Sequence, residues 1–205
     1  KSLLILDDDD PLRGRLARAM EKKGFISVLG PPGIGKTRLA RHWARQMHEE
    51  RLAHCIFFCD LGRCTSVDDF QRTLMGTLDL VMADSLLDEQ QRLRKLGSAV
   101  AQRNIDILIL DSVEHVRLET QTFLEMLAGY APNSFLLITS QVAIKTPAEQ
   151  QVHVPRLHVG PQTKACAALD LFRARAAQVQ ARIADDDQTN AEILSLIRAL
   201  DGVPL

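Results

Sequence analysis

The sequence is poor in aromatic residues and has no excess of charge of either sign. Aromatic side chains make up 4% of the 205 residues, with one Trp and one Tyr, so a core must be built from aliphatic side chains. Basic and acidic residues nearly balance, 25 against 26. A basic excess or patch is typical of proteins that bind nucleic acid or membrane surfaces. We therefore expect no direct nucleic-acid binding by this fragment.

Long apolar runs and metal-type cysteine pairs are also missing. The longest apolar runs, such as IDILIL at 105–110, are far shorter than the ~20 residues that a membrane span needs. No secretion signal is visible, so we expect a cytoplasmic protein without a membrane partner. The cysteines, Cys55, Cys59, Cys64 and Cys166, lack the paired C-x-x-C spacing of zinc sites. We interpret them as reduced thiols rather than metal ligands.

What the sequence does contain is a regular alternation of short apolar runs and stretches of helical period. The apolar runs predict strands at 2–6, 25–30, 54–61, 105–111, 134–140 and 151–154. Helical periodicity fills the intervals, and two helices at 163–182 and 188–200 then follow each other without a strand between them. This order favours a three-layer α/β fold, a parallel sheet covered by helices, followed by a small helical subdomain.

A phosphate-binding motif follows the strand at 25–30. Residues 30–37, GPPGIGKT, match G-x-x-x-x-G-K-[ST] and open an amphipathic helix. Glycines let the backbone amides point inward at the positive end of that helix, where they bind phosphate. Lys36 would contact the β- and γ-phosphates, and the Thr37 hydroxyl would bind Mg²⁺. The alternative is a Gly/Pro-rich turn that happens to precede a helix. The candidate nucleotide-binding residues here are Gly30, Pro31, Pro32, Gly33, Ile34, Gly35, Lys36, Thr37 and Arg38.

A second metal ligand is expected from the strand at 105–111. Asp111 ends this apolar strand, and open α/β sheets bind ligands at the carboxyl ends of their strands. One or two carboxylates usually complete a Mg²⁺ site, so Asp111 is the candidate partner of Thr37. The alternative is an aspartate that caps the following helix. Asp106 begins the same strand, at the wrong end of the sheet, and is interpreted as structural.

From residue 25 onward the chain resembles the ATPase module of STAND-class signal-transduction proteins. The resemblance is greatest to the modules of bacterial transcriptional regulators, which are relatives of the NB-ARC and apoptotic ATPases. The landmarks, in order, are LGPPGIGKTRLA, FFCDLGRCTSVDDF, LILDSVEHV, LLITSQ, ALDLFRARA and LDGVPL. The resemblance implies a P-loop NTPase sheet of strand order 5-1-4-3-2 over 25–160, the start of a helical lid over 161–205, and a switch between ATP and ADP. Pro204 would contact the base, although Gly202 and Pro204 also fit an ordinary helix stop.

The sequence departs from this family where hydrolysis would be expected. The position after Asp111, where relatives carry a second acid, holds Ser112, and Glu114 is the nearby candidate base. The arginine that senses the γ-phosphate is replaced by Gln141, whose neutral amide cannot offset developing phosphoryl charge. The family's winged-helix module and sensor repeats do not follow within this sequence. We therefore expect nucleotide binding with weak or absent hydrolysis, and a monomer.

Residues 1–24 resemble the first strand and helix of a response-regulator receiver. Asp7, Asp8 and Asp9 would fill that family's acidic, metal-binding role, but no phosphoacceptor strand follows. An exposed loop that begins a helix is the simpler interpretation, because acidic residues stabilise a helix start. The unit would add one parallel strand to the sheet. The junction of two families suggests a recombined or engineered chain.

Three functional hypotheses follow. The first is a regulatory module that binds ATP or ADP with Mg²⁺, in which Lys36 and Gln141 contact the nucleotide. The second is an active ATPase with Glu114 as base and Lys36 as the stabilising cation. The third is a folded, chimeric scaffold that binds no ligand.

Overall fold

The computed structural model describes residues 14, 16, 24–80, 88–115, 118–156 and 167–199. The chain divides into two compact units. The larger unit comprises residues 6–30 and 36–153, and the smaller comprises 1–5, 31–35 and 154–205. Within the described ranges, every helix is too short or too polar to cross a lipid bilayer.

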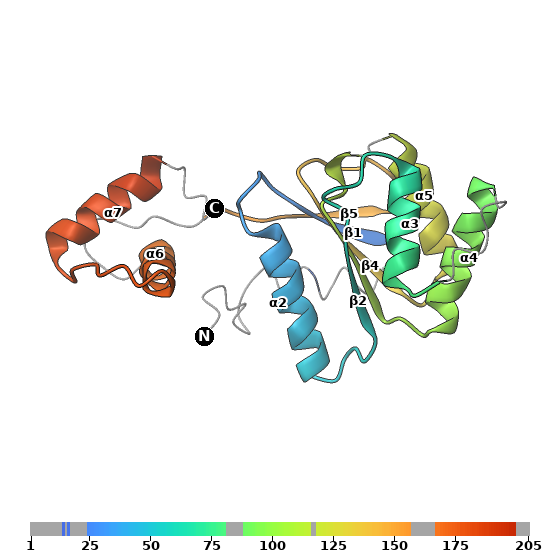
Figure 1. Ribbon diagram of the computed structural model, residues 1–205, viewed down its shortest axis with the longest axis horizontal. Coiled ribbons are helices and arrows are strands. Elements are labelled where there is room, and N and C mark those ends of the chain that lie inside the picture. Colours follow the sequence, from blue (N-terminus) through green and yellow to red (C-terminus); the bar gives the residue numbers. More distant parts are fainter. Residues whose placement is uncertain are drawn as a thin grey trace. The chain divides into compact units, whose positions relative to one another are not determined.

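The larger unit is built on a parallel sheet of five described strands (Figure 1). The strands are β1 (Phe25–Leu29), β2 (Ile56–Asp60), β3 (Ile107–Asp111), β4 (Phe135–Ser140) and β5 (Glu149–His153). Their order across the sheet is β2-β3-β4-β1-β5, and every neighbouring pair is parallel. Read from the other edge, this is the predicted order 5-1-4-3-2, which is confirmed. The additional strand predicted at 2–6 lies outside the described residues.

Helices cover both faces of this sheet. They are α2 (Lys36–Glu49), α3 (Val67–Thr77), α4 (Glu89–Gln102) and α5 (Leu118–Tyr130), with the 3₁₀ turn η1 (Val113–His115) after β3. Capping residues fix the starts of α3 and α4. The Ser66 side chain accepts a hydrogen bond from the Asp69 amide at the start of α3, and Asp88 forms a capping box with Gln91 at the start of α4. Figure 1 shows α2 on one side of the sheet and α3, α4 and α5 on the other.

The alternation of side chains along β3 decides what faces α2. Leu108 and Leu110 lie in the core that contains the buried residues of α3, α4 and α5. On α2, Trp43 packs against Phe135, with 5.6 Å between ring centroids. Phe135 is the register partner of Ile107. Because successive side chains of a strand point to opposite faces, Asp111 shares the α2 face with Ile107.

Residues 141–148, which we call the strap, connect β4 to β5 without a helix. Because the two strands are parallel, the strap must return from the carboxyl end of the sheet to its amino end. Its turn is held by Glu149, whose carboxylate accepts the amides of Ile144 at 2.9 Å and Lys145 at 2.8 Å. At its start, the Val142 amide donates to Ser140 Oγ at 3.3 Å. The strap is therefore an anchored segment.

The smaller unit contains α6 (Ala167–Gln178) and α7 (Asp187–Ala199), close to the two helices predicted there. Leu169 of α6 packs with Ile193, Leu194 and Ile197 of α7. Arg173 joins the two helices, since its guanidinium lies 2.7 Å from Asp185 and donates to Asn190 at 2.8 Å. The predicted segments around Asp7–Asp9, Cys166 and Pro204 lie outside the described residues, and the predicted domain limits at 24 and 160 stay predictions.

Candidate functional site

The predicted metal ligands lie together where α2 begins. Thr37 Oγ1 is 2.9 and 3.0 Å from the two carboxylate oxygens of Asp111 and donates to them. Asp111 is 4% exposed, so this carboxylate is almost fully buried. Its hydrogen bonds join it to α2 and β4, which favours the metal-ligand interpretation over a cap of the following turn. A hydroxyl and a carboxylate are the hard oxygen ligands that Mg²⁺ prefers, so the two residues fit that ion.

Thr139, which was not predicted as a site residue from the sequence, fixes the orientation of the Asp111 carboxylate. Its hydroxyl, fully buried, donates to Asp111 Oδ1 at 2.5 Å and accepts the Ser112 amide at 2.9 Å. The available signal was a polar residue near the carboxyl end of an otherwise apolar strand, in a strand that pairs with β3. Thr139 thus holds both Asp111 and the backbone that follows it.

Lys36 supplies a buried cation beside this carboxylate. The residue is 8% exposed, and its ammonium donates to the Gly30 carbonyl at 2.9 Å. Removal from water lowers the pKa of Lys36, and the negative charges of Glu114 and Asp111 oppose that shift. An ammonium at the positive start of a helix, poorly solvated, is an environment that an anion would stabilise. Lys36 therefore fits a polyphosphate ligand.

The loop between Gly30 and Lys36 has the backbone that its glycines predict. Gly33 and Gly35 adopt φ of 76° and 99°, values that favour glycine over any residue with a Cβ. The Ile34 amide donates to the Pro31 carbonyl at 3.4 Å, which closes a tight turn. Pro32 is exposed. Gly33 and Gly35 are thus needed for the left-handed backbone conformation that this loop adopts. Arg38, the remaining predicted binding residue on α2, is half-buried.

Glu114 and Gln141, predicted for separate roles, bind each other. Gln141 Nε2 donates to Glu114 Oε1 at 2.9 Å, which joins η1 to the start of the strap. The other carboxylate oxygen, Glu114 Oε2, is buried without a hydrogen-bond partner. Ser112, at the position of the expected second acid, adopts a left-handed φ of 65°. The side-chain amide of Gln141 is therefore already hydrogen-bonded to the Glu114 carboxylate.

The residues set aside as structural have structural contacts. Asp106 accepts the amides of His54 at 2.7 Å and Cys55 at 2.9 Å, and these bonds lower its pKa. Cys55, Cys59 and Cys64 are free thiols, and burial raises the pKa of Cys59 to about 11. In the part of the chain that the structure describes, no three His, Cys, Asp or Glu side chains group as metal ligands.

Two relatives from Mycobacterium bovis match most of this chain. This chain is 28% identical over 188 residues to the uncharacterised protein Mb0918. The aligned region covers 92% of this chain and 45% of that protein. This chain is also 26% identical over 183 residues to Mb0914c, a protein provisionally named an HTH-type transcriptional regulator. That aligned region covers 88% of this chain and 19% of Mb0914c. The chain therefore spans less than half the length of these curated relatives.

Solved structures share the fold at low sequence identity. Cdc6p from Pyrobaculum aerophilum superposes with a TM-score of 0.60 at 14% identity, over 85% of this chain and 51% of that one. The STAND protein PH0952 from Pyrococcus horikoshii has a tetratricopeptide repeat sensor. It superposes with a TM-score of 0.54 at 17% identity, over 94% of this chain and 28% of that one. The Aeropyrum pernix ORC2 protein, solved in ADPNP–ADP complexes, superposes with a TM-score of 0.53 at 15% identity, over 93% of this chain and 59% of that one. These likenesses concern the P-loop NTPase fold.

A model of the AAA domain family matches residues 18–142, which is more than half of the chain. The matched range contains the phosphate-binding motif, the strand that ends at Asp111, and the strand that carries Thr139. Sequence match, sheet order and the placement of Lys36, Thr37 and Asp111 agree. The chain therefore belongs to the AAA domain family of P-loop NTPases.

Proposed function

We propose that this chain is a regulatory module that binds ATP or ADP together with Mg²⁺ and hydrolyses ATP weakly or not at all. The observation that carries the proposal is the contact between the Thr37 hydroxyl and the buried Asp111 carboxylate, at 2.9 and 3.0 Å, next in sequence to the buried Lys36. Adenine is inferred from the family, and ORC2, a structural relative, was solved with adenine nucleotides.

Each residue has a distinct role in this proposal. Thr37 and Asp111 would hold Mg²⁺, which neutralises phosphate charge when it is bound. Lys36 would exchange its bond to the Gly30 carbonyl for phosphate oxygens, since a carbonyl is a weaker partner for a cation than an anion is. The amides of residues 31–35 would bind phosphate, and Pro204 would contact the base, as the STAND resemblance implies.

Weak hydrolysis is inferred from what stands next to Asp111 and after β4. Ser112 offers a hydroxyl where a carboxylate would activate water, and its amide is already bonded to Thr139. Gln141 offers no positive charge and donates to Glu114. Loss of a cation that stabilises phosphoryl transfer costs about 10³–10⁵ in rate. Binding and turnover are thus separable in this chain.

The regulatory part of the proposal draws on the relatives. One is named as an HTH-type transcriptional regulator and one solved structure is a STAND protein with a repeat sensor. Because this chain covers 19% of the first and 28% of the second, we propose that it is the nucleotide switch of a larger signalling protein of that class, NB-ARC-like and cytoplasmic. By itself we expect it to be a monomer.

Replacement of Lys36 tests the proposal directly. We expect Lys36→Ala to abolish Mg²⁺-dependent binding of a fluorescent ADP analogue, because the buried cation that offsets phosphate charge is lost. Calorimetric titration with ATP, ADP and GTP, with and without Mg²⁺, gives the affinities. Arg45→Ala is the matched control, because Arg45 is an exposed cation on the same helix. Unchanged affinity in the Lys36 variant would refute the proposal.

A second candidate function is an active ATPase with Glu114 as general base. The observation that favours it is the buried Glu114 Oε2, which has no hydrogen-bond partner and belongs to a carboxylate whose charge acts on Lys36. A carboxylate with one unsatisfied oxygen is able to accept a proton from water. Measurement of phosphate release separates this candidate from the first.

The origin of residues 1–24 is a separate proposal. We infer from their resemblance to a receiver that they come from a different family than the AAA domain. The match to the AAA domain family begins at residue 18, so residues 18–24 fall within that family and the inferred junction must precede them. The complete coding sequence tests the idea, since a continuous receiver upstream would refute a junction at this point.

A further inference from the structure

The two oxygens of the Asp111 carboxylate have different hydrogen-bond partners. Oδ1 accepts the Thr139 hydroxyl at 2.5 Å and the Thr37 hydroxyl at 2.9 Å, whereas Oδ2 accepts only Thr37, at 3.0 Å, among the described residues. A hydroxyl carries a single hydrogen, so Thr37 satisfies one of the two oxygens at a time. Oδ1 always has its bond from Thr139, and Oδ2 is therefore the oxygen that is left to face a cation.

The Thr139 hydroxyl is held in this direction by a second bond. Its oxygen accepts the Ser112 amide at 2.9 Å. A backbone amide can only donate and an ionised carboxylate can only accept, so the hydroxyl hydrogen must point to Asp111. Because the Thr139 side chain is fully buried, water does not compete for that hydrogen.

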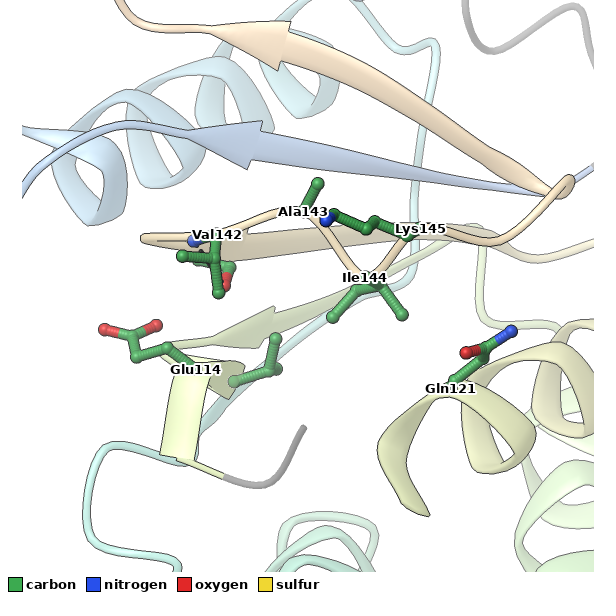
Figure 2. A pocket seen from close by; sticks show the side chains of 8 residues that line it. Glu114, Gln121, Val142, Ala143, Ile144 and Lys145 are labelled. Atoms are coloured by element: carbon green, nitrogen blue, oxygen red, sulfur yellow. Dashed lines mark hydrogen bonds between the residues drawn. The ribbon is translucent and has the colours of Figure 1, made fainter. Parts of the chain in front are cut away.

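The sheet makes this contact rigid. Leu110 of β3 pairs with Ile138 of β4, so Asp111 and Thr139 are the next neighbours on adjacent strands, and β4 lies between β3 and β1. Past these residues the two chain segments leave the sheet, and η1 and the strap line a cavity of about 410 Å³ (Figure 2). The Thr139 hydroxyl thus lies where the paired strands end and fixes both the carboxylate and the backbone that leaves β3.

We propose that Thr139 makes this site select Mg²⁺ over Ca²⁺. The inference rests on the proposed function, because the ion is expected to bind together with a nucleotide. Mg²⁺ requires near-ideal octahedral geometry at about 2.0–2.1 Å, whereas Ca²⁺ takes about 6–8 oxygen ligands at about 2.3–2.6 Å and accepts both oxygens of one carboxylate. A carboxylate whose Oδ1 is held by Thr139 offers one oxygen in a fixed direction, which suits Mg²⁺ and denies Ca²⁺ a bidentate ligand.

Replacement of Thr139 tests the proposal. Binding of a fluorescent ADP analogue is titrated with Mg²⁺ or Ca²⁺, and the half-saturating free concentrations of the two cations are compared. Thr139→Val keeps the shape of the side chain but lacks the hydroxyl. We expect it to raise the half-saturating Mg²⁺ concentration by about 10–100-fold, the usual effect of removing a residue that orients a metal ligand. The value for Ca²⁺ should rise less, because Ca²⁺ tolerates irregular ligands and gains access to Oδ1.

Three further variants separate the hydroxyl from packing. Thr139→Ser keeps the hydroxyl and should keep the native preference for Mg²⁺. Thr139→Ala removes the hydroxyl from a smaller side chain and repeats the test if the valine variant does not fold, as judged by circular dichroism. Thr146→Val is the matched control, because Thr146 is a buried strap residue whose hydroxyl accepts the Ala148 amide at 3.1 Å, next to the start of β5 rather than to Asp111.

The ratio of the two half-saturating concentrations decides the outcome. A purely structural role of Thr139 would weaken the binding of both cations equally, so an unchanged ratio in Thr139→Val would overturn the proposal. Equal affinity of the native chain for the two cations would overturn it as well. A native chain that does not bind the nucleotide would refute the proposed function and this inference together, whereas an unchanged ratio in a chain that binds nucleotide refutes this inference alone.

Discussion

At the scale of single residues, the carboxylate of Glu114 distinguishes a nucleotide-binding module from an ATPase. Its bond to Gln141 and the hydroxyl at Ser112 argue against a working base. We expect Glu114→Gln to leave single-turnover phosphate release unchanged, because the slow reaction of the native chain does not use this carboxylate. Release is measured with a phosphate sensor at saturating Mg²⁺-ATP.

The control for this substitution is Glu125→Gln, which changes the same charge at an exposed position of α5. General base catalysis contributes about 10²–10⁴-fold in rate. A fall of that size in Glu114→Gln, with none in the control, would contradict this expectation and establish Glu114 as the base.

Sequence reasoning predicted Thr37 and Asp111 as neighbours but not the residues that orient them. The prediction worked because the carboxyl ends of parallel strands meet at one edge of the sheet, where the helix after the motif also begins. Thr139 was missed because its bond to Asp111 depends on the lateral register of β3 and β4. The pair of Glu114 and Gln141 depends on the 3₁₀ turn after β3, which no local pattern indicated.

At the scale of elements, the packing of α4 on α5 depends on the absence of a side chain at Gly97. A Cβ at this position would lie 2.2 Å from the Cβ of Tyr130, which is far inside van der Waals contact. We expect Gly97→Ala to lower the free energy of unfolding by about 1–3 kcal/mol, because the two helices must move apart. Urea denaturation followed by circular dichroism measures the change.

Gly129→Ala is the matched control, because it also lies in a helix of this pair and a Cβ there meets nothing within 4 Å. Alanine exceeds glycine in helix propensity by about 1 kcal/mol, so the control should be neutral or stabilising. If both variants have the same midpoint, close packing at Gly97 does not limit stability.

The elements themselves were largely predictable, and the strap was not. Strands ending at Asp111 and Ser140 followed from apolar runs, and the starts of α3 and α4 agree with caps at Ser66 and Asp88. The strap carries the apolar residues Val142, Ala143 and Ile144 without helical or strand period. Its course is set by local hydrogen bonds, from the amides of Ile144 and Lys145 to the carboxylate of Glu149, and no periodic pattern of the sequence indicated this turn.

At the scale of the whole molecule, the folded chain and its ligand should be thermodynamically linked. A ligand that binds only the native state adds about 2.7 kcal/mol at a hundredfold excess over its Kd. We expect Mg²⁺-ATP to raise the melting temperature of the native chain, since Lys36, Thr37 and Asp111 come together only on folding. Differential scanning fluorimetry over a series of nucleotide concentrations measures the shift.

The same scan distinguishes a ligand-binding module from a scaffold that keeps only the fold. In Lys36→Ala the sheet order and the contact of Thr37 with Asp111 do not require the lost ammonium, so the variant should fold yet show no nucleotide-dependent shift. Arg45→Ala should shift as the native chain does, because its exposed side chain lies on the same helix away from the buried residues. Identical melting temperatures of the native chain with and without Mg²⁺-ATP would favour the scaffold, because a site that binds the native state must stabilise it.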